Sequence, residues 1–245
     1  MPDPGVCLSI VTFNSGRYIR RCLESALAQK DIRAEIVVVD NASTDQTGEI
    51  LRNFGNRIRV IWNQRNVGFA EAQNQGIRST RLPWVLTLNP DLLMKEDFTR
   101  QLVEAAEFDP GTGAVCGKLL SIGPGFEPLP DLRFDSTGIF FTPTLRHFDR
   151  GWQERDNGQY DRTEYVFGAC AAAALYRRRM IDDVAIEGCF FDPISSPTAR
   201  MPMSPGAPSC WAGAASTPRM PWAGTCAAWC RAIATRFRPP SICTR

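Results

Sequence analysis

The sequence predicts an α/β protein in which a mostly parallel β-sheet carries helices on both faces. Short β-branched apolar runs alternate with amphipathic stretches from residue 7 to residue 120, at a spacing that favours right-handed strand–helix–strand crossovers. The predicted strand 35–39 is apolar throughout after Glu35, as expected of a strand that is covered on both faces. A hydrophobic fraction of 44% with 22% charged residues is ordinary globular composition, and it excludes disordered, collagen-like and coiled-coil chains.

The first expected elements follow from apolar periodicity. A strand over 7–13 precedes a helix at about 17–29 with one apolar face, made of Ile19, Cys22, Leu23, Ala26 and Leu27. After the strand 35–39, a second helix is predicted to begin at Ser43, whose hydroxyl would cap it while Gln46 takes the capping-box position. A third strand is expected over 58–62.

The later elements are less regular. The pattern predicts a helix over 69–78, a strand over 84–88, a helix over 95–107 and a strand over 113–120. From 121 to 162 it weakens into Gly, Pro and mixed charge, which is typical of a functional or mobile segment. Regularity resumes over 164–167 and 171–176 and stops at Asp192.

Residues 193–245 differ in composition from the body, residues 1–192. This tail holds nine of the 18 prolines, four of the nine cysteines and six of the 28 basic residues, and it has no acidic residue. The net charge of +2 therefore divides into −4 for the body, with 22 basic and 26 acidic side chains, and +6 for the tail. No apolar periodicity is evident in the tail, so we expect it to be irregular, without a fold of its own.

The compartment is predicted from absences. No apolar run approaches the roughly 20 residues that a spanning helix needs, and residues 1–5 lack a signal-peptide layout. The five cysteines of the body lie mostly in apolar runs, which suits a reducing cytosol. We expect a cytoplasmic protein, and the net charge is too small to indicate nucleic-acid binding.

Small polar residues and acids follow four of the predicted strands. They occupy 12–15, 40–45, 63–68 and 89–91. Any one group is equally explained by turn and helix-cap formation, but four together favour a polar ligand, because ligands bind at the carboxyl ends of parallel strands. Asp91 stands at a rigid strand end, where it could hold one divalent cation that bridges a diphosphate.

Several nucleotide-binding classes are disfavoured by missing glycines. The stretch after the first strand, Asn14-Ser15-Gly16-Arg17, lacks the G-x-G-x-x-G of a dinucleotide fold and the Gly-rich basic loop of a sugar nucleotidyltransferase. Gly117-Lys118 has no glycine-rich lead and is not a Walker loop. An acid such as Asp40 at the end of the second strand still suits a ribose hydroxyl or a base N–H.

The same stretches resemble glycosyltransferase family 2, whose members have the GT-A (Rossmann-like) fold. The resemblance covers about residues 6–192 and is strongest to a bacterial branch that includes rhamnosyltransferases of cell-surface polysaccharides. Its motifs occur in order: 9–15 (SIVTFNS), 37–45 (VVVDNASTD), 63–70 (NQRNVGFA) and 88–91 (LNPD).

The resemblance implies roles for particular residues. Those implied to contact the nucleotide sugar are Thr12, Asn14, Asp40, Asn41, Ser43, Asp45, Asn66, Gly68, Asn74 and Asn89. Of these, Thr12, Asn14 and Asp40 would line the base and ribose, and Asn66, Gly68 and Asn74 would lie near the ribose and diphosphate. Asp91 would hold Mg²⁺ or Mn²⁺ as the last acid of a D-x-D-type motif whose first acid is Asn89 here. Gly168 and Ala169 match the loop beside the acceptor.

The implied reaction is an inverting sugar transfer. The donor would be a dTDP- or UDP-sugar, with rhamnose as one candidate, and the acceptor a cell-surface polysaccharide or a lipid-linked glycan. The family's base lies in an acidic E-D-x-D-type motif shortly after a segment to which Cys189-Phe190-Phe191-Asp192 corresponds. The match is lost after Asp192, so the catalytic base is not identified, and the alternative is an inactive nucleotide-sugar-binding remnant.

A shifted reading frame explains the tail. Triplets made from the last base of each codon and the first two of the next permit F-F-A-Y-R-E-D-A-D-V-A-W from residue 194 onward, with Ala forced at each Met-Pro junction. This resembles the missing acidic motif. The hypothesis is that one base was lost near codon 193 (a frameshift), so that 1–192 is an incomplete domain and 193–245 is translated out of frame; a genuinely divergent tail is the rival explanation.

Three lesser features have more than one explanation. Arg177-Arg178-Arg179 could meet an anionic membrane or a lipid-diphosphate acceptor at the inner face of the plasma membrane, or be a solvated helix start. The tail cysteines form no C-x-x-C pair and are attributed to chance, and His147 is expected to be a surface residue. Oligomeric state does not follow from the sequence.

Overall fold

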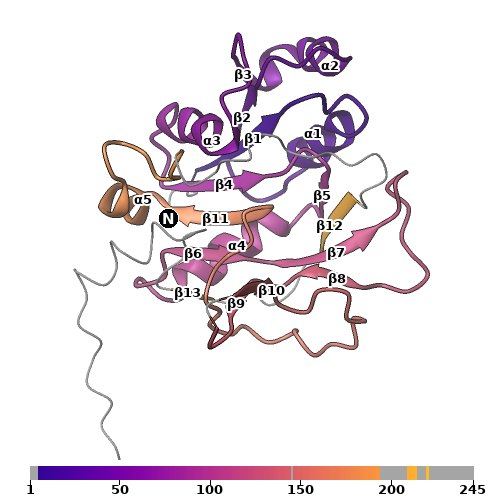
Figure 1. Ribbon diagram of the computed structural model, residues 1–245, viewed down its shortest axis with the longest axis vertical. Helices are drawn as coiled ribbons and strands as arrows, with labels where there is room; N and C mark the ends of the chain where they lie inside the picture. Colours follow the sequence, from indigo (N-terminus) through magenta and orange to yellow (C-terminus); the bar gives the residue numbers. More distant parts are fainter. Residues whose placement is uncertain (1–4, 145, 194–208, 214–218, 221–245) are drawn as a thin grey trace, which may run out of the picture.

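The computed structural model describes residues 5–144, 146–193, 209–213 and 219–220. Within these residues, seven strands form a central sheet in the order β13-β6-β11-β4-β1-β2-β3. Helices lie on both faces of this sheet, and a second, smaller sheet stands beside it (Figure 1). The mixed α/β class with a largely parallel centre, predicted from alternation, is confirmed.

The parallel half of the central sheet is made by the first four strands of the chain. β1 pairs in parallel with β2 and with β4, and β2 pairs in parallel with β3. Their bounds are Val6–Thr12 for β1, Ala34–Asp40 for β2, Arg59–Trp62 for β3 and Trp84–Leu88 for β4. The carboxyl ends of these strands therefore meet at one edge of the sheet.

The other half of the sheet reverses direction. β11 (Ala173–Arg177) runs antiparallel to β4 on one side and to β6 (Ala114–Cys116) on the other. Because the start of β11 pairs with the end of β4, the segment before β11 reaches the same edge as the carboxyl ends of the parallel strands. β13 (Arg219–Met220) pairs with β6.

The smaller sheet has the order β5-β12-β7-β8, and a separate hairpin lies below it (Figure 1). Its strands are β5 (Leu92–Met94), β12 (Ser209–Gly213), β7 (Lys118–Ile122) and β8 (Phe134–Ser136). The hairpin pairs β9 (Ile139–Phe141) with β10 (His147–Asp149). At the seven residues of β12 and β13 the structure differs from the expected irregular tail; the rest of the tail lies outside the described residues.

The helices cover the sheet through the apolar faces that the sequence predicts. They are α1 (Ile19–Leu27), α2 (Thr47–Asn53), the single 3-10 turn η1 (Gly55–Arg57), α3 (Phe69–Arg78), α4 (Phe98–Glu107) and α5 (Arg178–Val184). Ile19, Cys22, Leu23 and Ala26 are buried as expected, whereas Leu27, at the end of the face, is 36% exposed. Among the described residues, no helix is long and apolar enough to cross a membrane.

Three local expectations differ from the structure. The second helix begins at Thr47, not Ser43, and its first turn has no side-chain cap, because the Ser43 hydroxyl is bonded elsewhere. The expected strand 113–120 divides into β6 and β7 at Gly117, where an added Cβ would lie 2.6 Å from the Phe98 ring. The regular stretch 164–167 belongs to no helix or strand.

Candidate functional site

The carboxylate of Asp40 is the centre of a hydrogen-bonded group at the carboxyl ends of β1 and β2. Its Oδ1 accepts from the Thr12 hydroxyl at 2.8 Å and from the Ser43 hydroxyl at 2.6 Å, and its Oδ2 accepts from the Ser43 N–H at 3.0 Å. Asp40 and Thr12 are buried. The parallel register that places Thr12 opposite Asp40 explains why these two residues, 28 positions apart, are neighbours.

A second layer of bonds ties the loop after β1 to the loop after β2. The Asn14 N–H donates to the Ser43 hydroxyl at 2.9 Å, and the Asn14 side-chain oxygen accepts from the Thr44 N–H at 2.8 Å. Asn14 and Ala42 both have left-handed backbone, with φ of 51° and 61°. A left-handed backbone costs free energy at residues other than glycine, and it persists only where the surrounding contacts hold it, often at functional sites. The bonds between the two loops supply such contacts and fix the shape of both loops.

Asp45 closes the outer rim of this group. Its carboxylate accepts from the N–H of Gly16 at 2.9 Å and from the N–H of Thr47 at 3.0 Å. Burial alone would raise the pKa of Asp45, but the hydrogen bonds from Thr47 and Gly16 outweigh it and lower that pKa. Gly16 is required here because a Cβ would lie 2.9 Å from the Asp45 oxygen.

The start of α3 joins the same edge through Gly68. The Asn41 side chain donates to the Gly68 carbonyl at 3.2 Å, and the Gly68 N–H donates to the Asn66 side chain at 2.9 Å. Gly68 has φ of 87°, which a side chain would disfavour. Asn63 supports Asn41 with a bond of 2.9 Å to its side-chain oxygen.

Asn89 and Asp91 stand at the end of β4, on the other side of β1. The Asn89 N–H donates to the Ala172 carbonyl at 2.9 Å, and the Asn89 carbonyl accepts from the Cys22 thiol at 3.5 Å. Burial raises the pKa of Asp91, and the nearby charge of Asp135 on β8 raises it further. Burial raises the pKa of Cys22 to about 12, and the charge of Asp91 contributes.

A divalent cation fits this position. A largely buried carboxylate beside a second acid is destabilised in its charged form, and a bound cation would offset that cost. Among the described residues, no group of three or more His, Cys, Asp or Glu side chains could hold a metal by itself. A cation at Asp91 would therefore take its other ligands from phosphate oxygens and water, as Mg²⁺ commonly does.

Asn74, which the resemblance implies to lie near the ribose and diphosphate, is bonded to the end of the body. It is buried, and its side chain accepts from the N–H groups of Phe190 and Phe191 at 3.1 and 2.9 Å and donates to the Phe191 carbonyl at 2.7 Å. Asn74 thus holds the segment that ends at Asp192.

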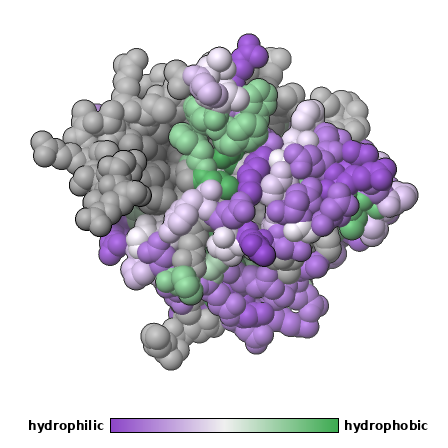
Figure 2. Space-filling view, turned by 90° about the horizontal axis from the view of Figure 1, so that it is seen from below, coloured by the Kyte–Doolittle hydropathy of each residue, from purple (hydrophilic) through white to green (hydrophobic). Residues whose placement is uncertain are grey.

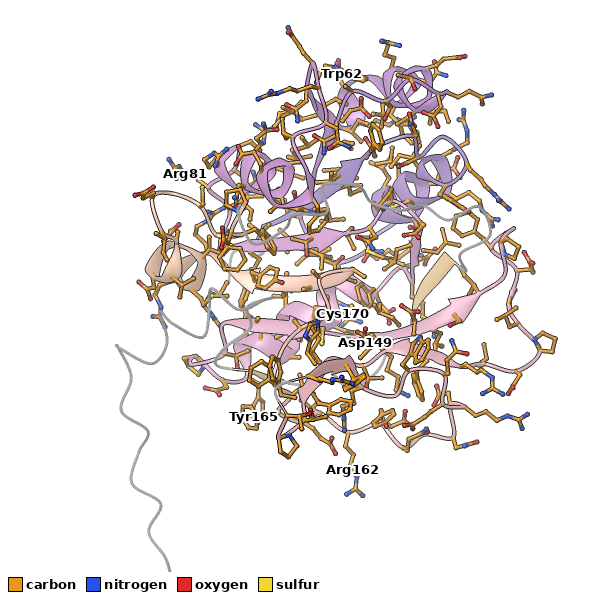
Figure 3. The ribbon with its side chains drawn as sticks, in the orientation of Figure 1. Trp62, Arg81, Asp149, Arg162, Tyr165 and Cys170 are labelled. Carbon is orange, nitrogen blue, oxygen red and sulfur yellow. The ribbon has the colours of Figure 1, made fainter. Side chains whose placement is uncertain are left out.

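Gly168 and Ala169 are buried in the segment before β11. Gly168 exchanges backbone bonds with Ile139 of β9, at 2.7 and 3.2 Å, and four residues later Ala172 bonds to Asn89. The segment 168–172 therefore runs from the β9–β10 hairpin to the end of β4. Figure 3 shows Cys170 of this segment close to Asp149 of β10, and the charge of Asp149 contributes to the raised pKa of Cys170, after burial.

The three consecutive arginines mainly hold backbone. Arg177 donates to the carbonyls of Thr112 and Ala106 and lies over the Trp84 ring. Arg178 donates to the carbonyls of Ile77 and Thr80. Arg177 and Arg178 are partly buried, whereas Arg179 is exposed and donates to the Pro110 carbonyl at 3.4 Å. A solvated helix start therefore describes Arg179 and not the other two side chains.

Sequence reasoning missed the neighbours that shape the site from a distance. Asp135 and Cys22 flank Asp91, and Asn63 supports Asn41. Only Cys22 gave a signal, as a member of the apolar face of α1, and that signal concerned packing. The others become neighbours only through the tertiary fold.

The arrangement of strands and helices defines a class of fold, the GT-A type. Among solved structures, the chain is similar to S. aureus TarS in complex with UDP, with a TM-score of 0.51 and 18% identity over 79% of this chain and 52% of that one. It is also similar to the mannosyltransferase PcManGT from Pyrobaculum calidifontis in complex with GDP-Man and Mn²⁺, with a TM-score of 0.50 and 20% identity over 76% and 49% of the two chains. At these identities the likeness shows the fold.

The family is shown by sequence. The model of glycosyl transferase family 2 matches residues 7–185, and the chain belongs to this family. A curated relative, the succinoglycan biosynthesis protein ExoO of Rhizobium meliloti, is 36% identical over 105 residues, which are 42% of this chain and 30% of that protein. Glycosyltransferase GlyG of Streptococcus pneumoniae is 30% identical over 105 residues, 42% of this chain and 35% of that protein. The chain thus matches about a third of the length of these relatives.

Proposed function

We propose that residues 1–192 are the donor-binding part of an inverting glycosyltransferase. The donor is a dTDP- or UDP-sugar, with rhamnose as the candidate sugar, and the acceptor is a cell-surface polysaccharide or a glycolipid. The observation that carries this proposal is the Asp40 group at the ends of β1 and β2 together with Asp91 at the end of β4, all at one edge of a parallel sheet.

The Asp40 group suits the nucleoside. Thr12, Asp40 and Ser43 form a rigid floor, and the exposed Asn14 and Asp45 form its rim. Polar side chains already fixed by internal bonds lose little entropy on binding, so they can select a base and a ribose. Asn41, Asn66 and Gly68 bring the start of α3 to the same edge, where the N–H groups of a helix N-terminus favour the diphosphate.

Asp91 suits the metal of such a donor. When bound there, Mg²⁺ or Mn²⁺ would stabilise the negative charge of the departing nucleoside diphosphate. Asn89 at the same strand end is held by Ala172 and faces the donor sugar in this proposal. The likeness to structures in complex with UDP and with GDP-Man and Mn²⁺ supports these assignments.

The acceptor class is supported by the relatives' names. One is a succinoglycan biosynthesis protein, and another, 30% identical over 115 residues, is a poly-beta-1,6-N-acetyl-D-glucosamine synthase of Staphylococcus aureus. Both names describe polymers of sugars. We therefore assign a saccharide acceptor to this chain, on the side of Gly168 and Ala169.

A thermal-shift titration with UDP and with dTDP, each with and without Mn²⁺, tests the donor site. We expect a metal-dependent rise in melting temperature, which Asp91→Asn makes metal-independent and Asp40→Asn reduces. The matched control is Asp183→Asn, an exposed carboxylate on α5. No shift with either nucleotide, or an equal loss in the control, would refute the proposal.

A second candidate concerns the tail. We infer that residues 193–245 are translated from another frame, so that this chain binds a nucleotide diphosphate but transfers no sugar. The composition of the tail supports this inference, and so does the burial of Phe190 and Phe191. These two residues show that the packed body continues almost to Asp192, the last acidic residue of the chain. Sequencing codons 188–197 and measuring turnover of the pure chain test it: sugar transfer, or an uninterrupted frame shared with a related gene, contradicts it.

A further inference from the structure

The β9–β10 hairpin exposes aromatic side chains that the packing of the body does not use. Phe140 and Phe148 lie opposite each other on one face, with ring centroids 5.7 Å apart and ring planes within 28° of parallel. They are 43% and 47% exposed. Figure 2, which views the molecule from the side on which Figure 1 places this hairpin, shows an apolar patch with hydrophilic residues along one of its sides.

The opposite face of the hairpin is attached to the body. Phe141 packs against Phe167 with ring centroids 4.1 Å apart, and Ile139 exchanges two backbone bonds with Gly168. The alternation of side chains along β9 separates these contacts from Phe140. The hairpin is therefore fixed through its inner face and presents the stacked pair Phe140–Phe148 outward.

The attachment also places the hairpin near the end of β4. From Gly168, which is paired with β9, the chain reaches Ala172 in four residues, a span of at most about 14 Å. The Ala172 carbonyl accepts from the Asn89 N–H at 2.9 Å. A chain of a few sugar units bridges such a distance, so an extended acceptor whose end lies at Asn89 and Asp91 would reach the hairpin.

We propose that Phe140 and Phe148 form a platform that binds sugar units of the acceptor away from the reacting end. Two nearly parallel rings at this spacing match the flat C–H face of a pyranose, and they lose little entropy because their side chains have only two rotatable angles. Hydroxyl groups stand at the end of the same hairpin, on Thr142 and Thr144, whose oxygens are 2.9 Å apart. This inference rests on the proposed transferase function.

The charges around the platform favour a saccharide over a membrane. A surface that docks on anionic lipid gathers basic residues of one sign. Here Asp149 lies on β10 itself, and Arg150, directly after it, is paired with Glu164. The exposed Arg146 directly before β10 is accompanied by Asp149 at its end, so the charge beside the rings is mixed and suits a saccharide.

A second exposed aromatic site supplies the control. Phe108 and Tyr165 line a surface pocket of about 400 Å³ with Thr163 and Glu164, and Phe108 is 81% exposed. Phe108 follows α4 and precedes the first residue of β6, which lies at the amino-terminal edge of the sheet, opposite the proposed donor site. The pocket shares Glu164 with the ion pair beside the platform, so Phe108→Ser tests whether saccharide binding belongs to the stacked rings or to any exposed ring on this side.

The test uses saturation-transfer NMR on the full chain, with a β-1,6-linked N-acetylglucosamine trisaccharide and cellotriose as probes at about 1 mM, where weak contacts are measurable. We expect transfer to the ring C–H protons of at least one probe. The double variant Phe140→Ser/Phe148→Ser should weaken that binding about tenfold or more, whereas Phe108→Ser should leave it unchanged. Melting temperatures of the variants confirm that each is folded.

Three outcomes overturn the platform. They are no transfer to either probe, an equal loss in Phe108→Ser, and sedimentation of the chain with phosphatidylglycerol vesicles that the double variant abolishes. The UDP and Mn²⁺ thermal shift is measured on the same samples. A shift that persists while saccharide binding is absent refutes the platform alone, and absence of the shift refutes the donor site separately.

Discussion

Replacing Asn74 with Ala tests whether this side chain holds the end of the body or touches the donor. The native side chain satisfies two N–H groups and one carbonyl of Phe190 and Phe191, all within a buried region. Phe190 and Phe191 also pack edge-to-face on the buried ring of Tyr176, at 4.9 and 6.1 Å between centroids. The alanine variant leaves the three backbone groups without these partners.

The cost follows from those groups. An unsatisfied buried polar group costs about 1–3 kcal/mol, so three of them predict a loss of roughly 3 kcal/mol or more in the free energy of unfolding. If the segment 188–192 detaches locally, the loss is limited to the packing of the two phenylalanines. For a domain of this size, about 3 kcal/mol lowers the melting temperature by roughly 6–12 °C.

Urea unfolding followed by tryptophan fluorescence measures the loss, and hydrogen exchange of the Phe190 and Phe191 amides locates it. We expect both to change in Asn74→Ala and neither to change in Asn56→Ala, an exposed asparagine after α2. UDP affinity of the folded variant should stay at the wild-type value. A variant of full stability that has lost UDP binding would refute the role of Asn74 in holding the segment that ends at Asp192. It would favour the donor-side role that the family resemblance implies.

Three further outcomes are expected. Asp91→Asn should raise the free energy of unfolding at neutral pH and have little effect in acid. The raised pKa means that the Asp91 carboxyl holds its proton more tightly in the folded state than in the unfolded state. The stability of the native protein therefore falls as pH rises from the ordinary pKa of 3.8 through the pKa of Asp91 in the folded state. Mn²⁺ affinity should rise as pH rises through the same window, because the metal binds the ionised Asp91 carboxylate. Gly76→Ala should lower the free energy of unfolding in urea by about 1–3 kcal/mol, because its Cβ would lie 2.3 Å from the Ser9 hydroxyl oxygen. Gly48→Ala on α2, whose Cβ would lie 3.5 Å from the nearest atom, should raise it by about 0.5–1 kcal/mol. Equal effects of the two substitutions would contradict this. Gly68→Ala should weaken UDP binding through strain at φ 87°, and unchanged affinity in the thermal-shift titration would count against it.

The periodicity of apolar residues was sufficient to predict the bounds of those helices and strands that have one continuous buried surface. The expected helix 69–78 and strand 84–88 coincide with α3 and β4, because an amphipathic face and a fully apolar run each identify a buried surface. The division of 113–120 at Gly117 depends on the Phe98 ring, which is distant in sequence. The three-residue strands β8 to β10 are held by bonds such as Phe134 N–H to Glu154 O, which leave no periodic signal.

The candidate site also contains contacts that the sequence predicts and contacts that it does not predict. Thr12, Asp40 and Ser43 lie in short motifs at strand ends, and a parallel sheet necessarily brings those ends together, so the sequence predicts their proximity. The bonds of Asn74 span 117 residues, and the approach of Asp135 to Asp91 depends on the assembly of the smaller sheet, in which β5 and β8 are the two edge strands. Neither contact follows from a motif.

The boundary between body and tail can be argued from packing as well as composition. Phe190 and Phe191 are 4% and 6% exposed, and their N–H groups are bonded to Asn74 on α3, a helix in the first third of the chain. Selection for that packing must therefore have acted on the sequence as far as Phe191. From Pro193 onward the chain has no acidic residue and half of its prolines. A divergent but selected tail would be expected to change composition gradually, whereas a lost base changes every codon after it, and the abrupt change directly after Asp192 favours the second explanation.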